Sequence, residues 1–184
     1  MISINYLFEN KQFEAEYNLL HDIMNKYKNK IPIYTDKIIF KKNVIPVSHP
    51  ILTLNLRWKD SKNPNITLLS LLIHEQLHWF EDKYVTKTKY NEILKDYEYL
   101  FDEYKTIFYN DIVAFIIHIV VIVNEINIMK MITTKKEFEQ NYYDINYHRP
   151  YELFEKHVID NFKELNNYLK QKDLIWDKDK ELKK

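Results

Sequence analysis

The most informative segment of the chain reads Leu68-Leu69-Ser70-Leu71-Leu72-Ile73-His74-Glu75-Gln76-Leu77-His78. An apolar run leads into two histidines four residues apart, a spacing that puts both imidazoles on one face of a helix, about one turn apart. Two imidazoles so placed can reach a single tetrahedral zinc ion. Glu75 leans over the open coordination position, where it can accept a proton from metal-bound water. The segment therefore predicts a zinc site carried by a helix.

The residues around this motif predict a helix over residues 64–83, preceded by a strand. Asn63 is suited to cap the helix, and Pro64 is suited to its first position. The segment before it, residues 44–58, looks extended. Four large apolar residues alternate there with polar ones, which is the pattern of a half-buried strand: Leu52, Leu54, Leu56 and Trp58.

The remaining elements follow from helical spacing and turn residues. Residues 31–42 look extended, and residues 133–149 are polar and aromatic with turn character. Further helices are predicted over residues 10–28, 90–109, 111–131 and 151–170. We therefore expect an α+β fold, mostly helical, with a small N-terminal β-sheet before the motif helix. Residues 1–176 should form a single domain, and residues 177–184 should be a charged, disordered tail.

Composition and charge exclude several classes of protein. The chain has 184 residues, which suits one domain, and its 27 basic and 27 acidic residues cancel, whereas a general nucleic-acid binder carries a basic excess. Without cysteine, a transition-metal site must use histidine and carboxylate. The N-terminus lacks the features of a signal peptide, and the longest apolar run, residues 112–123, is too short to span a bilayer. We expect a cytoplasmic protein that has no nucleic-acid partner and no membrane span.

The three residues His74, Glu75 and His78 resemble the H-E-x-x-H signature of the zincin metallopeptidases. In that family a strand precedes the motif helix and its edge holds an extended peptide substrate, and residues 52–58 occupy that place here. The resemblance implies a zincin-like fold, a Zn²⁺ cofactor and a peptide or protein substrate. The third histidine of the metzincin branch does not follow His78. Asn124-Glu125 instead looks like the Asn-Glu pair that supplies the third ligand in the gluzincin branch.

Glu125 is also a candidate ligand on physical grounds. It lies in a nearly all-apolar helical segment, residues 111–131, where a buried carboxylate costs several kcal/mol unless it is paired or bound to metal. His118 lies seven residues earlier on the same face, and Asp111 lies seven residues before that. This polar stripe requires a partner, which a zinc site would provide. We therefore predict His74, His78 and Glu125 as the metal ligands.

Two other side chains are alternative third ligands. His118 can be a ligand itself, a group that orients a ligand, or a core histidine with an ordinary hydrogen-bond partner. Glu152 follows Pro150, and some small zincins place a carboxylate ligand far downstream in a similar Pro-x-Glu setting. However, an acidic residue in the first turn of a helix is already favourable without any metal. We rank both residues behind Glu125.

Zincins also use a hydrogen-bond donor that stabilises the tetrahedral oxyanion, commonly a Tyr or a His. Tyr147 and His148 are the best candidates, because the loop before the last helix should be exposed and Arg149 follows them. Only two of the 27 basic residues are arginines, Arg57 and Arg149. An arginine among so many lysines can mark a site that needs a planar fork for a carboxylate, although a surface salt bridge is the commoner role.

Two hypotheses follow. The first is a zinc-dependent hydrolase, a metallopeptidase of zincin type in which Glu75 is the general base. The second is a catalytically inactive helical interaction protein whose metal is structural or absent. A structural zinc site would be closed by a fourth protein ligand, so both His118 and Glu125 would bind the metal. An open coordination position that faces Glu75 would favour the enzyme.

Overall fold

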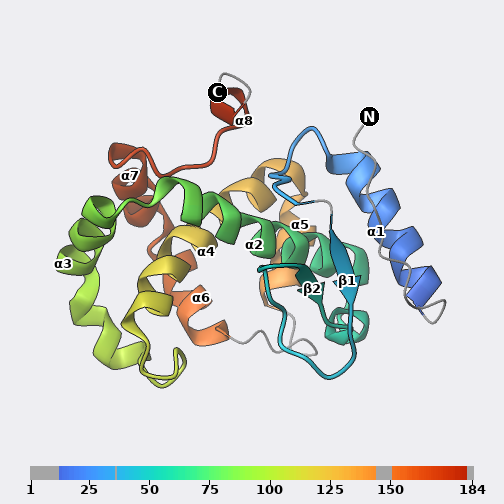
Figure 1. The fold of residues 1–184 in the computed structure, drawn as a ribbon, viewed down its shortest axis with the longest axis horizontal. Coiled ribbons are helices and arrows are strands. Elements are labelled where there is room, and N and C mark those ends of the chain that lie inside the picture. The colour runs from blue at the N-terminus through green and yellow to red at the C-terminus, as the bar shows by residue number, and fades with distance from the viewer. Residues whose placement is uncertain (1–12, 36, 144–150, 182–184) are drawn as a thin grey trace.

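The part of the chain that the structure describes is mostly helical, with 68% of its residues in helices, and contains one small parallel sheet of two strands (Figure 1). The structure is a computed structural model that describes residues 13–35, 37–143 and 151–181. An α+β fold dominated by helices is therefore confirmed at this coarse level.

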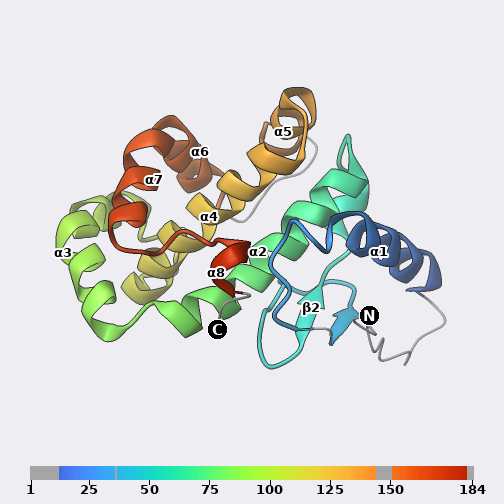
Figure 2. The ribbon, with the colours of Figure 1, turned by 90° about the horizontal axis from the view of Figure 1, so that it is seen from above.

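Two long helices cross at the centre of the molecule, α2 (Pro64–Tyr84) and α4 (Ile112–Ile132). They pack against each other more extensively than any other two elements. In Figure 2, α1 (Glu14–Tyr27) and the sheet lie on one side of this crossing, and α3 (Lys87–Tyr104) lies on the other. The side chains of α4 are buried all round its middle, and each fully buried Ile or Val contributes about 1.5–3 kcal/mol to stability. The two stretches of sequence that carry the candidate ligands therefore meet in the core.

The sheet is smaller than the sequence predicts. β1 (Ile38–Phe40) pairs in parallel with β2 (Leu52–Leu54), and Val47 forms a single antiparallel bridge with Thr53 on the other edge of β2. The predicted strand over residues 44–58 is wrong beyond β2, because Arg57–Asp60 form the 3₁₀ helix η2. Trp58 therefore enters the core from a helical turn. All three residues of β2 are buried; α2 packs against this strand, and Tyr17 of α1 contacts Phe40 of β1 with 5.2 Å between ring centres.

Local signals explain how the two central helices begin. Pro64 occupies the first turn of α2 as expected, but Asn63 makes no side-chain capping hydrogen bond. Asp111 caps α4, because its Oδ1 accepts hydrogen bonds from the backbone N–H groups of Val113 (2.8 Å) and Ala114 (3.1 Å). Asp111 therefore has a capping role, rather than a place in the polar stripe of the helix.

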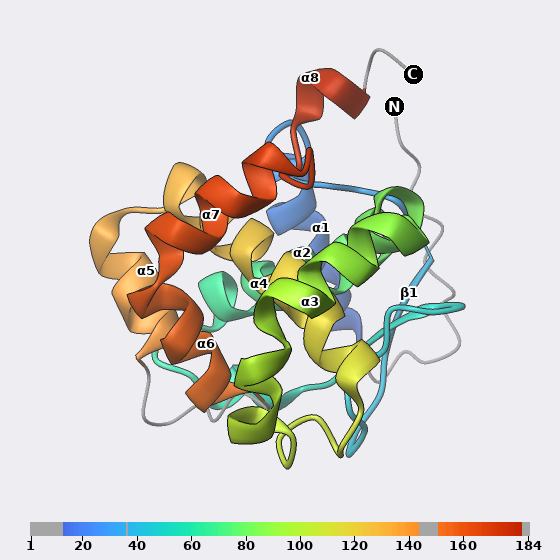
Figure 3. The same ribbon diagram turned by 90° about the vertical axis from the view of Figure 1, so that its left-hand side faces the viewer.

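The C-terminal half contains more helices than the sequence predicts. The polar segment after α4 contains α5 (Lys135–Tyr142), which begins with a capping box formed by Thr134 and Glu137. The predicted helix over residues 151–170 is divided into α6 (Glu152–Asp160) and α7 (Phe162–Gln171), which follow one another along one side of the molecule (Figure 3).

Part of the predicted disordered tail is ordered. Lys178–Glu181 form the short helix α8, and the Glu181 carboxylate accepts hydrogen bonds from the Tyr34 hydroxyl (2.8 Å) and from Nζ of Lys83 (3.0 Å). Both partners of Glu181 lie about 100 residues or more away in the sequence. The composition of the tail alone therefore does not predict these interactions.

Among the described residues, one helix is long and apolar enough to cross a membrane by length and composition alone, and this is α4. In its most apolar window, 72% of the residues are buried inside the protein. A buried core helix passes the same test, so the expected absence of a membrane span stays a prediction.

Asn124 connects α4 to the C-terminal segment. Its Nδ2 donates to the carbonyl of Leu174 (2.9 Å), and its Oδ1 accepts from the backbone N–H of Trp176 (2.6 Å). We predict that Asn124→Ala lowers the free energy of unfolding by about 1–3 kcal/mol, because two buried backbone groups lose their partners. Urea unfolding measures this change. Asn127→Ala, which removes a part-buried amide from the same helix, should cost clearly less. Equal costs for the two variants would contradict the prediction.

Candidate metal centre

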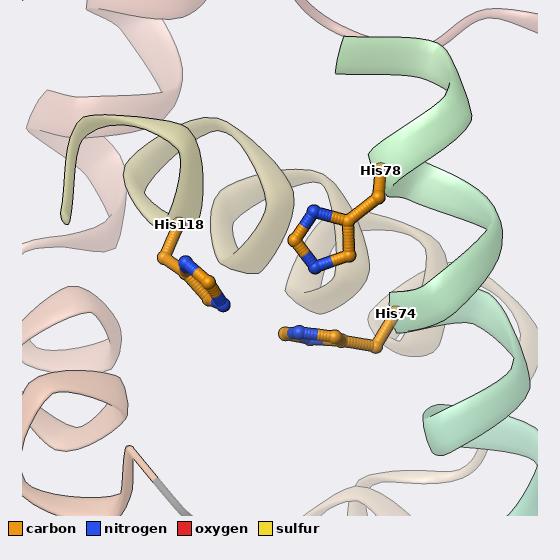
Figure 4. A group of neighbouring side chains, drawn as sticks. All are labelled: His74, His78 and His118. Atoms are coloured by element: carbon orange, nitrogen blue, oxygen red, sulfur yellow. The ribbon is translucent and has the colours of Figure 1, made fainter. Parts of the chain in front are cut away.

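Three imidazoles converge between the two central helices (Figure 4). His74 and His78 come from α2, and His118 comes from α4. Each offers one ring nitrogen, and these three nitrogens lie within 4.8 Å of one another. Such a group can bind one ion, because ligand nitrogens about 2.0–2.1 Å from a tetrahedral zinc lie roughly 3.3 Å apart, a spacing that small side-chain adjustments can reach.

Hydrogen bonds orient two of the three rings. Nδ1 of His74 lies 2.9 Å from Oε2 of Glu125, and Nδ1 of His118 lies 2.6 Å from the carbonyl oxygen of Ala114. A carbonyl or an ionised carboxylate can only accept, so Nδ1 is the donor in both rings and carries the proton. This tautomer leaves Nε2 with a lone pair, which is the form that binds a metal ion.

Glu125 orients His74 and is itself held by other donors. It is fully buried, and its Oε1 accepts hydrogen bonds from the hydroxyls of Ser70 and Tyr142, the latter at 2.8 Å. Asn141 extends this network, because its Nδ2 donates to Oγ of Ser70 at 3.1 Å. The expectation that a buried carboxylate at this position needs partners is met by a histidine and two hydroxyls.

The geometry favours His118 over Glu125 as the third candidate ligand, while the ligand assignment itself stays a prediction. His118 joins the two motif histidines, whereas Glu125 lies behind His74 and contacts its outer nitrogen. Glu125 and His118 lie seven residues apart on one face of α4, and the crossing of α2 and α4 brings the His118 ring to within 5.5 Å of the His74 ring and 5.1 Å of the His78 ring, measured between centres. With both of its oxygens engaged, Glu125 fits the role of an orienting group better than that of a ligand.

The other candidates are placed as follows. Glu152 is exposed at the start of α6 and does not line the cavity beside the three histidines. Tyr147, His148, Arg149 and Pro150 lie outside the described residues. The predicted oxyanion donors therefore stay predictions.

Glu75 lies in the same cavity as the three imidazoles. This cavity has a volume of about 250 Å³, and its wall includes His74, Glu75, His78, His118 and Tyr151. Burial raises the pKa of the Glu75 carboxyl to about 7; His74 lowers it and Glu125 raises it. A carboxyl group with a pKa near neutrality is suited to exchange protons.

Burial also favours neutral imidazoles in the cluster. It lowers the pKa of His78 well below its usual range, and nearby His74 acts in the same direction. It likewise lowers the pKa of His118 to about 3. Neutral imidazole is the form of histidine that binds a metal ion, so burial keeps His78 and His118 in the form that can bind a cation.

Tyr151 is a site residue that the sequence reasoning missed. Its ring centre lies 4.2 Å from that of His118, and it stacks on Phe108 with 5.0 Å between ring centres. Burial raises the pKa of its hydroxyl to about 12, so this hydroxyl keeps its proton and can donate a hydrogen bond. Its only sequence signal is its position two residues after the predicted Arg149, which is weak in a chain with 15 tyrosines.

Comparison of the chain with protein-family models, curated proteins and solved structures finds no match. The evidence for a function therefore comes from the residues and geometry of this chain.

The geometry predicts different zinc affinities for variants of a ligand and of the orienting group. His118→Ala and His78→Ala should each lose zinc almost completely. Glu125→Gln should weaken binding about 10–100-fold, because it removes no proposed ligand and acts on the site through the orientation and basicity of His74. Competition with a chromophoric chelator measures these affinities, and His21→Ala, a variant of an exposed histidine, is the matched control. If Glu125→Gln loses zinc as completely as His78→Ala while His118→Ala retains it, Glu125 is the ligand.

Proposed function

We propose that this protein is a zinc-dependent hydrolase, a peptidase of zincin type, with His74, His78 and His118 as metal ligands. The observation that carries this proposal is the convergence of three imidazoles in one cavity with Glu75. Three imidazoles also suit copper, iron and nickel, and the preference for zinc follows from the H-E-x-x-H pattern.

The bound ion would supply a Lewis acid that polarises a scissile carbonyl and lowers the pKa of water toward neutrality. The protein's own residues would do the rest. Glu75 accepts a proton from the attacking water and returns it to the leaving amine. Tyr151 donates a hydrogen bond from its hydroxyl to the carbonyl oxygen as negative charge develops there. Glu125 keeps His74 in the tautomer that binds the ion.

The alternative is a catalytically inactive helical interaction protein with a structural or absent metal. A structural zinc site is closed by four protein ligands. Among the described residues the group contains three, and the Glu125 carboxylate is already bonded to His74, Ser70 and Tyr142. A three-ligand site that faces a cavity supports the enzyme over this alternative.

Glu75→Gln tests the proposed base. Glutamine keeps the size of the side chain but cannot accept the proton, so hydrolysis should fall at least about 10³-fold while zinc content stays near that of the wild type. The measurement uses a quenched-fluorescence peptide library with the zinc-loaded protein. Glu139→Gln, a variant of an exposed glutamate on α5, is the control. A Glu75→Gln protein that cleaves at the wild-type rate would exclude this mechanism.

Tyr151→Phe tests the proposed oxyanion donor. It removes only the hydroxyl and leaves the ring stacked on Phe108, so the fold and the metal content should not change. We expect kcat to fall about 10²–10³-fold with little change in KM, because the hydrogen bond matters mainly in the transition state. Tyr99→Phe, at an exposed tyrosine, is the control. If kcat is unchanged, another group supplies the donor, and the loop with Tyr147 and His148 becomes the first place to search.

A further inference from the structure

The cavity beside the three histidines continues along α2 as a groove. Thr67, Leu71, His74 and His78 all line it, and their spacing of three to four residues defines one stripe on the helix. From Thr67 to His74 this stripe extends about 10 Å along the helix axis. A ligand held near the histidines therefore has room to extend toward the N-terminal end of α2.

An arginine lines this groove. Arg57 is the first residue of η2, which packs against α2 and is separated from its start by three residues. The turn that carries it is fixed by Asn55, whose Oδ1 accepts a hydrogen bond from the backbone N–H of Arg57 at 3.1 Å. Asn55 is itself buried, and both residues line the cavity. The guanidinium is therefore carried by a fixed backbone at the wall of the groove.

Nothing in the described part of the chain neutralises this guanidinium. None of the ion pairs or side-chain hydrogen bonds among the described residues involves it. The next cation along the chain behaves differently, because Lys59 on the same 3₁₀ helix is paired with the buried carboxylate of Glu16. The planar guanidinium of Arg57 is the side-chain cation that best matches the geometry of a carboxylate.

Arg57 is the one lysine or arginine among the described residues that line the cavity. A substrate carboxylate that enters the cavity would therefore meet a matching side-chain cation at this position.

We propose that the groove binds a substrate that carries a carboxylate, which Arg57 recognises about one to three residues from the scissile bond. This inference rests on the proposed hydrolase function. Arg57 and the histidines line one cavity, whose stretch along α2 from Thr67 to His74 is about 10 Å, and an extended peptide covers about 3.3 Å per residue, which sets the upper end of this separation. The carboxylate is either the C-terminus of the substrate or an Asp or Glu side chain.

The experiment uses matched pairs of metal-binding peptides and isothermal titration calorimetry on the zinc-loaded protein. The first pair is mercaptoacetyl-Leu-Ala as free acid and as amide, which tests a C-terminal carboxylate. The second is mercaptoacetyl-Leu-Glu-amide and its Gln analogue, which tests an acidic side chain after the metal. The third is acetyl-Glu-Leu-hydroxamate and its Gln analogue, which tests an acidic side chain before it. Within each pair the metal-binding group is identical, so it cancels in the ratio of affinities.

We expect at least one pair to show about tenfold or greater preference for the charged member. Arg57→Gln should abolish that preference, and Arg57→Lys should retain part of it, because the charge remains but the fork is lost. Lys41→Gln, which removes an exposed positive charge that does not line the groove, should leave it unchanged.

Two results would overturn the inference: equal affinities within all three pairs, or a preference that survives Arg57→Gln. The neutral members of the pairs test the hydrolase proposal separately. If they bind wild-type protein and lose affinity in His78→Ala, the open metal site stands whatever Arg57 does. If they do not bind, the proposed function fails, and the inference fails with it.

Discussion

A buried carboxylate at the crossing of α2 and α4 is the constraint on which the rest of this structure depends. Glu125 is fully buried, and an unpaired charge there would cost several kcal/mol. Three side chains satisfy it: His74 and Ser70 from α2, and Tyr142 from the end of α5. Because these partners come from two other elements, the network fixes how α4 lies across α2. The same crossing brings His118 to the motif histidines.

Helix α2 packs against other elements on more than one side, which explains why few of its side chains are exposed. While its histidines face the cavity and Ser70 faces Glu125, the buried Gln76 holds the segment before β1. Its Oε1 accepts hydrogen bonds from the backbone N–H groups of Tyr34 (2.7 Å) and Thr35 (3.1 Å). The middle residue of the motif, which is variable in H-E-x-x-H, thus attaches the segment before β1 to α2, the helix that carries two of the candidate ligands. A polar residue in that place is needed for packing rather than for chemistry.

The sequence predicted local structure well and relative placement poorly, for physical reasons. Periodicity identified α2 and α4, because apolar spacing and capping residues act within one helix. The choice between His118 and Glu125 depends on the axial offset between two helices. Two residues seven apart lie on the same face, about 10 Å apart along the axis, so no property of α4 alone decides which one reaches His74 and His78.

Two predictions of secondary structure are wrong for a similar reason. The alternation over residues 52–58 predicts one strand, yet after Leu54 the chain turns into η2 and buries Trp58 from a helical turn. The Trp58 ring still lies against Phe40 of the sheet, with 6.4 Å between ring centres, so the alternation reports burial and cannot distinguish a strand from a helical turn. The helix α5 was missed because its polar sequence lacks an apolar stripe. Its capping box of Thr134 and Glu137 was a local signal that could have revealed it.

The absence of glycine has a consequence for the loop that leads into α4. The chain reverses there through two successive residues with positive φ, Tyr109 (53°) and Asn110 (60°). Glycine adopts this conformation without penalty, whereas a tyrosine pays roughly 1–2 kcal/mol. Asp111 then caps α4, and the preceding Phe108 packs on His118 and Tyr151.

The strained turn therefore does more than connect two helices. It brings an aromatic side chain against His118 of the candidate metal site and against the proposed oxyanion donor, and it starts α4 at the register that presents His118. A looser glycine turn would leave both the ring and the helix start less defined, so the penalty at Tyr109 is offset by the order that the turn gives to the candidate site.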